Sequence, residues 1–197
     1  MRGWHKFVLY VAAGLQLSAQ QLSSPLVSTG AIEIGGRAVP YTIRRLPVTS
    51  FPDLPQAVAA ELGTRECLIP QTYEARRPEN VVHGSFEAPG SSDWAVLCFA
   101  RGTVSLLVFF GSAEGKPAVL ATAAETDRLQ EHTGSAVLGF NWGIDSASPE
   151  RVHEAQSGLS PRPARLDHDA LADATVDRGA VFRYFAKGQW TVVPLPD

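Results

Sequence analysis

Two segments in the middle of the chain, residues 94–99 and 104–110, are hydrophobic at both odd and even positions. This pattern is typical of central strands that are covered on both faces of a sheet. The short polar stretch between them predicts a hairpin turn. The expected cross-strand pairs are Trp94 with Phe109, Val96 with Leu107 and Cys98 with Ser105.

Further strands are predicted on either side of this hairpin. Residues 31–34 and 37–45 alternate apolar and polar positions around two glycines, which favours a second hairpin. Residues 180–186 and 189–193 predict a third, in which Phe185 faces Trp190. Shorter candidate strands cover residues 81–86, 117–122 and 136–142.

Four segments show helix signals. Asp53 can cap a helix over residues 53–62 that Gly63 would stop, because aspartate favours helix starts and glycine favours helix ends. Ser148 followed by a proline predicts a second helix to about residue 156. Residues 123–132 consist mainly of helix-forming residues, and Asp167 can cap a helix over residues 168–174.

Together these patterns predict an α+β fold: a mainly antiparallel, hairpin-built sheet with two to four short helices packed on it and one disulfide. At 197 residues, of which 45% are hydrophobic, the chain suits a single globular domain. That domain is expected over residues 31–197, after a Ser-rich, flexible lead over residues 20–30.

The first nineteen residues have the order of a secretory signal peptide. A basic start with Arg2 and Lys6 precedes an apolar run over residues 7–15, and a small-residue end allows cleavage after Ala19. The apolar run is about half the length that a membrane-spanning helix needs. We therefore predict an extracytoplasmic protein, periplasmic or secreted, with no stable membrane insertion after signal cleavage.

Two cysteines, Cys67 and Cys98, lie in the exported part of the chain. An even number of cysteines in an oxidising compartment predicts a disulfide, here closing a loop of about thirty residues. The chain-entropy estimate for such a loop is roughly 3 to 4 kcal/mol of stabilisation. Two buried free thiols are the alternative.

The charge composition argues against nucleic-acid binding. The chain has 17 lysines and arginines against 20 aspartates and glutamates, and no basic block. A nucleic-acid binder usually carries a basic patch or stripe. We therefore expect no nucleic acid among the partners.

Within residues 80–110 the sequence VHGSFEAPGSSDWAV resembles one FG-GAP (VCBS-type) repeat of integrin-like β-propellers. The resemblance rests on Gly84, Phe86, Gly90 and Asp93, the last of which begins an apolar strand. It implies a loop whose oxygens hold Ca²⁺. The chain is too short for the several repeats of a complete propeller.

This loop departs from the family pattern where the ligands matter. Ser85 and Pro89 replace carboxylates, and Glu87 replaces an asparagine, so that Asp93 is the ligand that remains unchanged. Calcium usually takes six to eight oxygen ligands. Glu87 and Asp93 are thus candidates only, and no metal and no cofactor is predicted.

Catalytic motifs are not assembled in the sequence. The histidines lack the spacing of zinc ligands, and no Gly-x-Ser-x-Gly motif is present. Catalytic residues can nevertheless be dispersed along a chain. The candidates for a small secreted hydrolase are the region of His83, Glu87 and Asp93, or His153 with His168.

Two other polar segments are candidates for binding. Tyr73, Arg76 and Arg77 lie in a polar loop after Cys67, and loops often carry function. Asp169, Asp173 and Asp177 would share one side of a helix and form a weak cation site or, more simply, part of a solvated face.

The sequence therefore predicts a non-catalytic extracytoplasmic module that binds a partner from the envelope or the extracellular medium, or contributes to envelope structure. A small secreted hydrolase and a calcium-stabilised binding domain are the alternatives.

Overall fold

The computed structural model describes residues 26–113 and 115–196. The predicted signal peptide, residues 1–19, and residues 20–25 of the expected lead lie outside the described residues. The rest of that lead is not an irregular segment, because Leu26 already begins the first strand.

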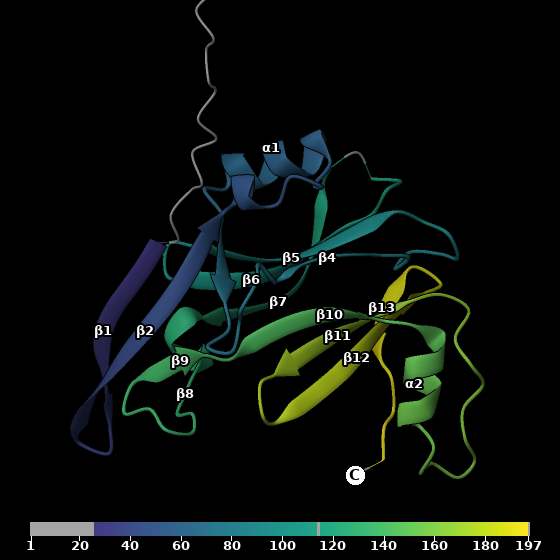
Figure 1. The fold of residues 1–197 in the computed structure, drawn as a ribbon. Helices are drawn as coiled ribbons and strands as arrows, with labels where there is room; N and C mark the ends of the chain where they lie inside the picture. Colours follow the sequence, from purple (N-terminus) through teal and green to yellow (C-terminus); the bar gives the residue numbers. More distant parts are fainter. Residues whose placement is uncertain (1–25, 114, 197) are drawn as a thin grey trace, which may run out of the picture.

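The described residues form two packed sheets (Figure 1). The larger sheet contains nine strands: β1 (Leu26–Ile34), β2 (Arg37–Pro47), β3 (Leu68–Gln71), β4 (Val81–Gly84), β5 (Asp93–Ala100), β6 (Thr103–Phe109), β7 (Pro117–Ala124), β8 (Leu129–Gln130) and β9 (Leu138–Phe140). The smaller sheet has the order β10 (Trp142–Ala147), β11 (Ala170–Thr175), β12 (Gly179–Ala186) and β13 (Gln189–Val192).

Two α-helices and two 3-10 turns complete the described elements. They are η1 (Val48–Ser50), α1 (Gln56–Thr64), η2 (Glu125–Arg128) and α2 (Pro149–Ala155). Among the described residues, no helix is long and apolar enough to cross a membrane. Figure 1 shows α1 over the larger sheet, and α2 beside the smaller one.

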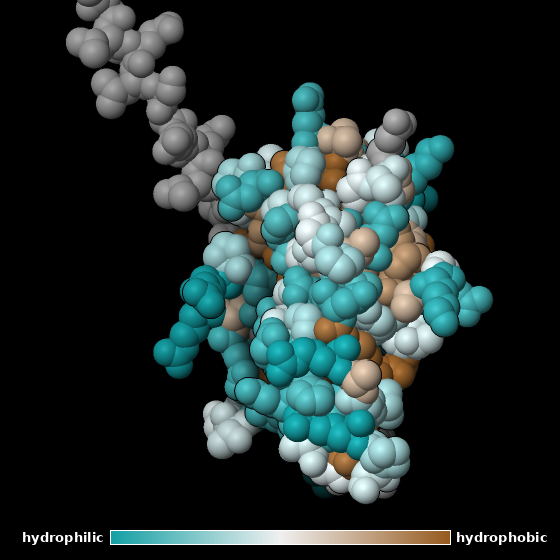
Figure 2. Space-filling view, turned by 90° about the vertical axis from the view of Figure 1, so that its right-hand side faces the viewer, coloured by the Kyte–Doolittle hydropathy of each residue, from teal (hydrophilic) through white to brown (hydrophobic). Residues whose placement is uncertain are grey.

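Hydrophilic residues cover most of the face seen in Figure 2, with hydrophobic residues exposed in separate areas.

The predicted hairpin of β5 and β6 is the centre of the fold, and its register is confirmed. Cys98 pairs with Ser105, and Trp94 pairs with Phe109. One face of the hairpin packs against α1, and the opposite face packs against residues of the smaller sheet such as Trp142 and Leu171. Both faces are therefore buried, which explains the unbroken apolar pattern. Because the largest core cluster takes residues from both sheets, the two sheets share one core.

The Cys67–Cys98 disulfide is confirmed, with the two Cα atoms 5.1 Å apart. Both cysteines are buried in the cluster beneath α1. The bond ties the segment after this helix to the central hairpin, across 31 residues of sequence. A disulfide in such a position is typical of proteins from oxidising compartments.

We expect the disulfide to resist alkylation and to contribute to stability. Intact mass after alkylation without reduction should show no added label, because no cysteine is free among the described residues. The double variant Cys67→Ser/Cys98→Ser should lose roughly 3 to 4 kcal/mol of unfolding free energy in urea titrations. Two labels on unreduced protein would contradict the pairing.

The expected α+β class is wrong. The protein is mostly β, with 47% of the described residues in strands and 14% in helices, and it has two sheets in place of one. Residues 168–174 were expected to be helical, but β11 covers most of them and pairs with β10 on one side and β12 on the other. Small buried alanines fit between two strands, so that tertiary packing overrides their helix propensity.

The helix expected over residues 123–132 is also wrong. Its first two residues end β7, its middle forms η2, and Leu129–Gln130 forms β8. Glu125 is buried against Arg45, and an amphipathic helix could not place it there while keeping the strand pairing of its neighbours. The chain therefore turns once and returns to the sheet.

The other two predicted helices exist with adjusted ends. Ser148 caps α2 by accepting a hydrogen bond from the Arg151 backbone N–H, as expected. In α1 the residue before the helix is Pro55, and Asp53 makes no capping hydrogen bond. The helix continues past Gly63, and Glu66, with a φ of 57°, follows its end.

Candidate functional site

The loop between β3 and β4, residues 72–79, brings together the binding candidates that the sequence suggested. Tyr73 is half-buried, whereas Arg76 and Arg77 are exposed. We call residues 72–79 the arginine loop. Cavities lie on both of its sides and share Thr72 and Ala75 as lining residues.

Two buried amide side chains hold the ends of the arginine loop. Gln71, 1% exposed, donates from Nε2 to the Glu79 carbonyl oxygen and accepts from the Glu79 backbone N–H, both at 3.0 Å. A carboxylate oxygen of Glu79 accepts a hydrogen bond from the backbone N–H of Thr72 at 2.7 Å. The first and last residues of the loop are therefore joined through side chains.

Asn80 fixes the loop to both sheets. Its Nδ2 donates to the carbonyl oxygens of Pro70 and Trp142, and its Oδ1 accepts from the Ile144 backbone N–H. The residue is 1% exposed and has a φ of 68°, a conformation that asparagine tolerates better than most residues.

Two further hydrogen bonds anchor the arginine loop. Arg44 donates to the Ala75 carbonyl oxygen, and the Tyr73 N–H donates to the Phe140 carbonyl oxygen.

We expect Asn80→Ala to loosen the arginine loop. The substitution removes the side-chain partner of the Ile144 N–H and one donor each from the Pro70 and Trp142 carbonyl oxygens, and it should cost about 2 to 3 kcal/mol. Hydrogen exchange should show faster exchange at Ile144 than in the wild type. Unchanged exchange at Ile144 together with unchanged stability would refute this role.

On one side of the loop, a cavity of about 380 Å³ surrounds Tyr73. The ring of His132 stacks on Tyr73 with the centroids 4.4 Å apart. Gly139 permits this arrangement, because a Cβ atom there would lie 2.4 Å from that of Tyr73. The Tyr73 hydroxyl donates to Asp177 at 2.6 Å, and burial, followed by this carboxylate, raises the pKa of Tyr73 to about 12. The hydroxyl therefore stays protonated at neutral pH.

On the other side, a cavity of about 730 Å³ separates the loop from β10 and β11. Gly143 and Ala174, which are paired across these strands, line it with little side-chain volume. Arg76 and Arg77 lie at this cavity and make no hydrogen bond or ion pair with the other described residues.

The charges around the larger cavity are partly neutralised. Arg151 pairs with Asp145 at 2.8 Å, and Glu79 is occupied by the Thr72 N–H. Glu74, Arg76 and Arg77 have no hydrogen-bond or ion-pair partner among the described residues. Over the whole lining the three arginines balance the carboxylates of Glu74, Glu79 and Asp145, so the cavity carries no net charge. Two neighbouring unpaired guanidinium groups can bind carboxylates through paired hydrogen bonds.

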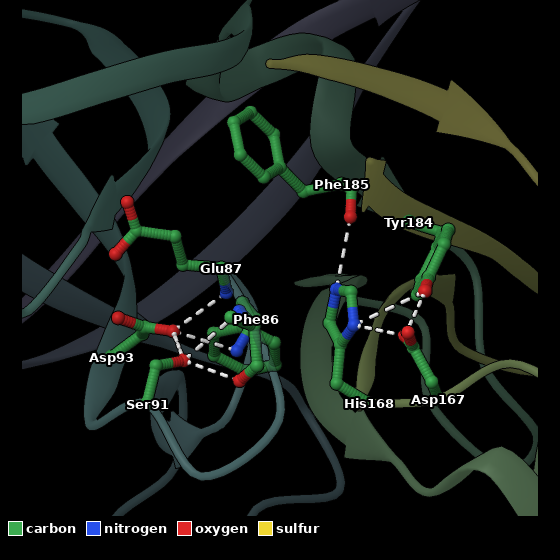
Figure 3. Close-up of polar contacts among 9 residues, drawn as sticks. Phe86, Glu87, Ser91, Asp93, Asp167, His168, Tyr184 and Phe185 are labelled. Carbon is green, nitrogen blue, oxygen red and sulfur yellow. Dashed lines mark hydrogen bonds and ion pairs between the residues drawn. The ribbon is translucent and has the colours of Figure 1, made fainter. Parts of the chain in front are cut away.

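The turn with the FG-GAP-like sequence is organised by Asp93, which is 0% exposed. Its Oδ2 accepts from the backbone N–H groups of Phe86 and Glu87, both at 2.7 Å, and from the Ser91 hydroxyl (Figure 3). Its Oδ1 accepts from the Gly111 N–H at 2.8 Å. Four donors thus use the roughly four lone-pair positions of the carboxylate.

This arrangement gives Asp93 a role in shaping the turn. The other candidate, Glu87, accepts from the Ser112 hydroxyl with both carboxylate oxygens. Within the described residues, His, Cys, Asp and Glu side chains form no group of three that could hold a metal ion. Three backbone N–H groups and the Ser91 hydroxyl occupy the lone-pair positions of Asp93 that a cation would otherwise use.

We expect the melting temperature to be the same in excess chelator and in millimolar Ca²⁺. A cation that binds the folded state would raise the melting temperature by mass action. Magnesium at the same concentration controls for ionic strength. A calcium-specific rise of several degrees would contradict the role assigned to Asp93.

His168 forms hydrogen bonds with both a carboxylate and a hydroxyl, but in a closed arrangement (Figure 3). Its Nε2 lies 2.9 Å from the Phe185 carbonyl oxygen, which can only accept, and its Nδ1 lies 2.5 Å from Asp167. The Tyr184 hydroxyl donates to the same carboxylate, and this bond, followed by the one with His168, lowers the pKa of Asp167. Both ring nitrogens are occupied, so the ring has no free lone pair for general-base catalysis.

The neighbouring Asp169 links this cluster to the turn of Asp93. Its backbone N–H donates to the Ser85 carbonyl oxygen, and its Oδ2 accepts from the Ser85 N–H. The acidic residues of 167–177 are thus distributed: Asp173 pairs with Arg183, and Asp177 binds Tyr73. They form no shared helical face, since the segment is not helical.

His83, the other histidine candidate, lies close to a serine that sequence reasoning missed. His83 Nε2 is 2.9 Å from the Ser92 hydroxyl, and both residues are exposed. The pairing of His83 with Trp94 across β4 and β5 brings Ser92 near. No carboxylate contacts the other ring nitrogen of His83 among the described residues.

His153, the last histidine candidate, lies on α2 and makes no hydrogen bond with His83 or His168. Its pKa is lowered by desolvation and, to a smaller extent, by the charges of Arg162 and Arg165.

No family model, curated protein or solved structure matches this chain. The resemblance of residues 80–110 to an FG-GAP repeat stays a prediction.

The residues that hold the arginine loop were not predicted. Gln71 and Asn80 precede and follow a polar loop in the sequence, as many surface amides do. One sequence signal could have identified them. Gln71 ends β3 and Asn80 directly precedes β4, and a polar side chain at a strand end can face the core.

Proposed function

We propose that the chain is an extracytoplasmic, non-catalytic binding domain that recognises a protein partner through the arginine loop. The observation that carries this proposal is a loop fixed at both ends by buried amides, with unpaired arginines at a cavity of about 730 Å³. A loop that is ordered before binding loses less conformational entropy when the partner arrives.

Several features favour a protein as the partner. The exposed tip of the loop carries charges of both signs, with Glu74 beside Arg76 and Arg77. Arginine and tyrosine contribute a large share of the binding energy at protein interfaces. The small residues Gly143 and Ala174 leave space at the cavity for a side chain of the partner.

The absence of assembled chemistry at this loop supports binding over catalysis. Among the described lining residues, Ser135 donates to the Val137 carbonyl oxygen, and His132 stacks on Tyr73 without a hydroxyl in hydrogen-bond contact. No nucleophile and base are therefore paired in either cavity. A catalytic site would need such a pair within hydrogen-bond distance.

The extracytoplasmic location rests on the signal-peptide pattern of residues 1–19 and is supported by the Cys67–Cys98 disulfide. Sequencing the amino terminus of protein recovered from outside the cytoplasm tests this directly. A terminus at Gln20 is expected. Protein retained in the cytoplasm with Met1 intact would refute the location.

Binding is tested by comparing captures from envelope extract. Immobilised mature protein should retain a partner that the charge-reversed variant Arg76→Glu/Arg77→Glu loses by about tenfold or more. The matched control Arg37→Glu/Lys187→Glu changes the charge equally at two exposed positions far from the loop in sequence, the first residue of β2 and the turn between β12 and β13. Equal retention by all three proteins would refute the arginine loop as the binding site.

The contact between Ser92 and His83 favours hydrolysis as a second candidate function. A histidine nitrogen 2.9 Å from a serine hydroxyl can accept its proton during nucleophilic attack. A fluorophosphonate probe should then label the wild type and spare Ser92→Ala. An unlabelled wild type, with an active serine hydrolase as positive control, would refute this candidate.

A further inference from the structure

A cavity of about 360 Å³ lies at the β11–β12 hairpin, and its lining differs from that of both cavities beside the arginine loop. Its lining combines two arginines, one aspartate and one hydroxyl with small apolar residues. The complete lining is Arg128, Asp173, Thr175, Arg178, Gly179, Ala180 and Val181.

The aspartate of this cavity is already neutralised. Arg183 donates to Asp173 Oδ2 from Nε at 2.8 Å and from Nη2 at 2.7 Å. The indole N–H of Trp142 donates to the other oxygen, Oδ1, at 2.7 Å. Asp173 therefore neither offers oxygens to a cation nor cancels the charge of the two lining arginines.

Those two arginines have no carboxylate partner among the described residues. The guanidinium carbon of Arg128 lies 4.0 Å above the ring of Trp142, whose own side chain is fully buried. Stacking on a fixed indole restricts the orientation of the guanidinium plane. Arg178 is exposed at the end of the hairpin, and the Thr175 hydroxyl makes no hydrogen bond with the described residues.

We propose that this cavity binds a small oxyanion, the carboxylate or phosphate group of a small molecule, between the guanidinium groups of Arg128 and Arg178. Both groups present hydrogen-bond donors in a planar fork that matches the oxygens of such an anion. The hydroxyl of Thr175 adds one more donor. The volume of about 360 Å³ suits a small molecule.

The remaining lining suggests where the rest of that molecule lies. Ala180 and Val181 give the cavity an apolar side, and Val181 is 40% exposed. An anion with a short apolar part can place its charge on the arginines and cover Val181. This cavity shares no lining residue with the two cavities beside the arginine loop.

Calorimetric titration of the mature protein with inorganic phosphate and with benzoate, at constant ionic strength set by chloride, tests the proposal. Saturable binding of at least one anion is expected. Arg178→Gln should weaken it by about tenfold or more, since a charged hydrogen bond is lost. Arg128→Lys should weaken it similarly, because lysine keeps the charge but lacks the planar fork.

The control Arg37→Gln removes an exposed, unpaired arginine elsewhere and should bind like the wild type. Arg178 makes no side-chain hydrogen bond or ion pair with the described residues, so its variant should retain the wild-type melting temperature even if Arg128→Lys is destabilised. Phosphate binding alone assigns a phosphate ligand, and benzoate binding alone assigns a carboxylate. Failure of both anions to bind, or equal weakening in Arg37→Gln, would overturn the proposal.

Discussion

Asp93→Ala is expected to lower the free energy of unfolding by about 3 to 5 kcal/mol. The buried carboxylate accepts three backbone N–H groups and one hydroxyl, and alanine would leave these donors without a partner. Losing these hydrogen bonds also loosens the turn that joins β4 to β5. In this turn the Ser85 N–H donates to Asp169, which directly precedes β11 of the smaller sheet. The substitution therefore affects both sheets.

Urea titration of the variant and the wild type measures this change. Asp53→Ala is the matched control, because Asp53 is exposed and makes no capping hydrogen bond, so its stability should change by about 0.5 kcal/mol or less. Equal effects of the two substitutions would mean that Asp93 does not organise the turn.

Glu125→Ala is expected to have an effect of similar size, about 3 to 5 kcal/mol. Glu125 and Arg45 form a two-pronged ion pair whose side chains are 9% and 7% exposed. Removing the carboxylate leaves a buried guanidinium that lies over the ring of Phe99 and retains, among the described residues, only the hydroxyl of Ser28 as a hydrogen-bond acceptor. An unpaired buried charge is much more costly than the ion pair itself is favourable.

The double variant Arg45→Met/Glu125→Leu distinguishes this cause from simple loss of packing. It removes both charges at similar volume, so most of the lost stability should return. Urea unfolding of the single and the double variants measures the difference. A double variant less stable than Glu125→Ala would contradict the account of the buried charge.

The hairpin registers could be predicted because pairing across a short turn is a local property. Phe185 faces Trp190, and Cys98 faces Ser105, as the alternation of side chains requires. The disulfide was predictable from the even number of cysteines and the export predicted from residues 1–19. These features need no knowledge of the rest of the fold.

The second sheet could not be predicted from local pattern. Residues 170–175 have the composition of a helix, and their strand conformation depends on β10 and β12 on either side. Glu125 similarly depends on Arg45, eighty residues earlier. Long-range partners of this kind decide the conformation of segments whose own propensities favour another state.

The candidate site was only partly predictable for the same reason. Tyr73, Arg76 and Arg77 were identified as exposed loop residues. The cavity at Arg76 and Arg77 is bounded by β10 and β11, which lie about seventy to one hundred residues later in the chain, and the cavity at Tyr73 is bounded by β2 and residues 132–139. The role of Asn80 depends on its contacts with Trp142 and Ile144 of β10, whereas Gln71 bonds across the loop to Glu79.

Site-specific photo-crosslinking in the producing cells tests the central claim most directly. Benzoylphenylalanine is placed at Arg76, which lines the cavity beside the arginine loop, or at the exposed Arg37, the first residue of β2, as the control. We predict a discrete crosslinked protein partner from position 76 and none from position 37. No crosslink from position 76, or the same products from both positions, would contradict the proposal that the arginine loop binds a protein.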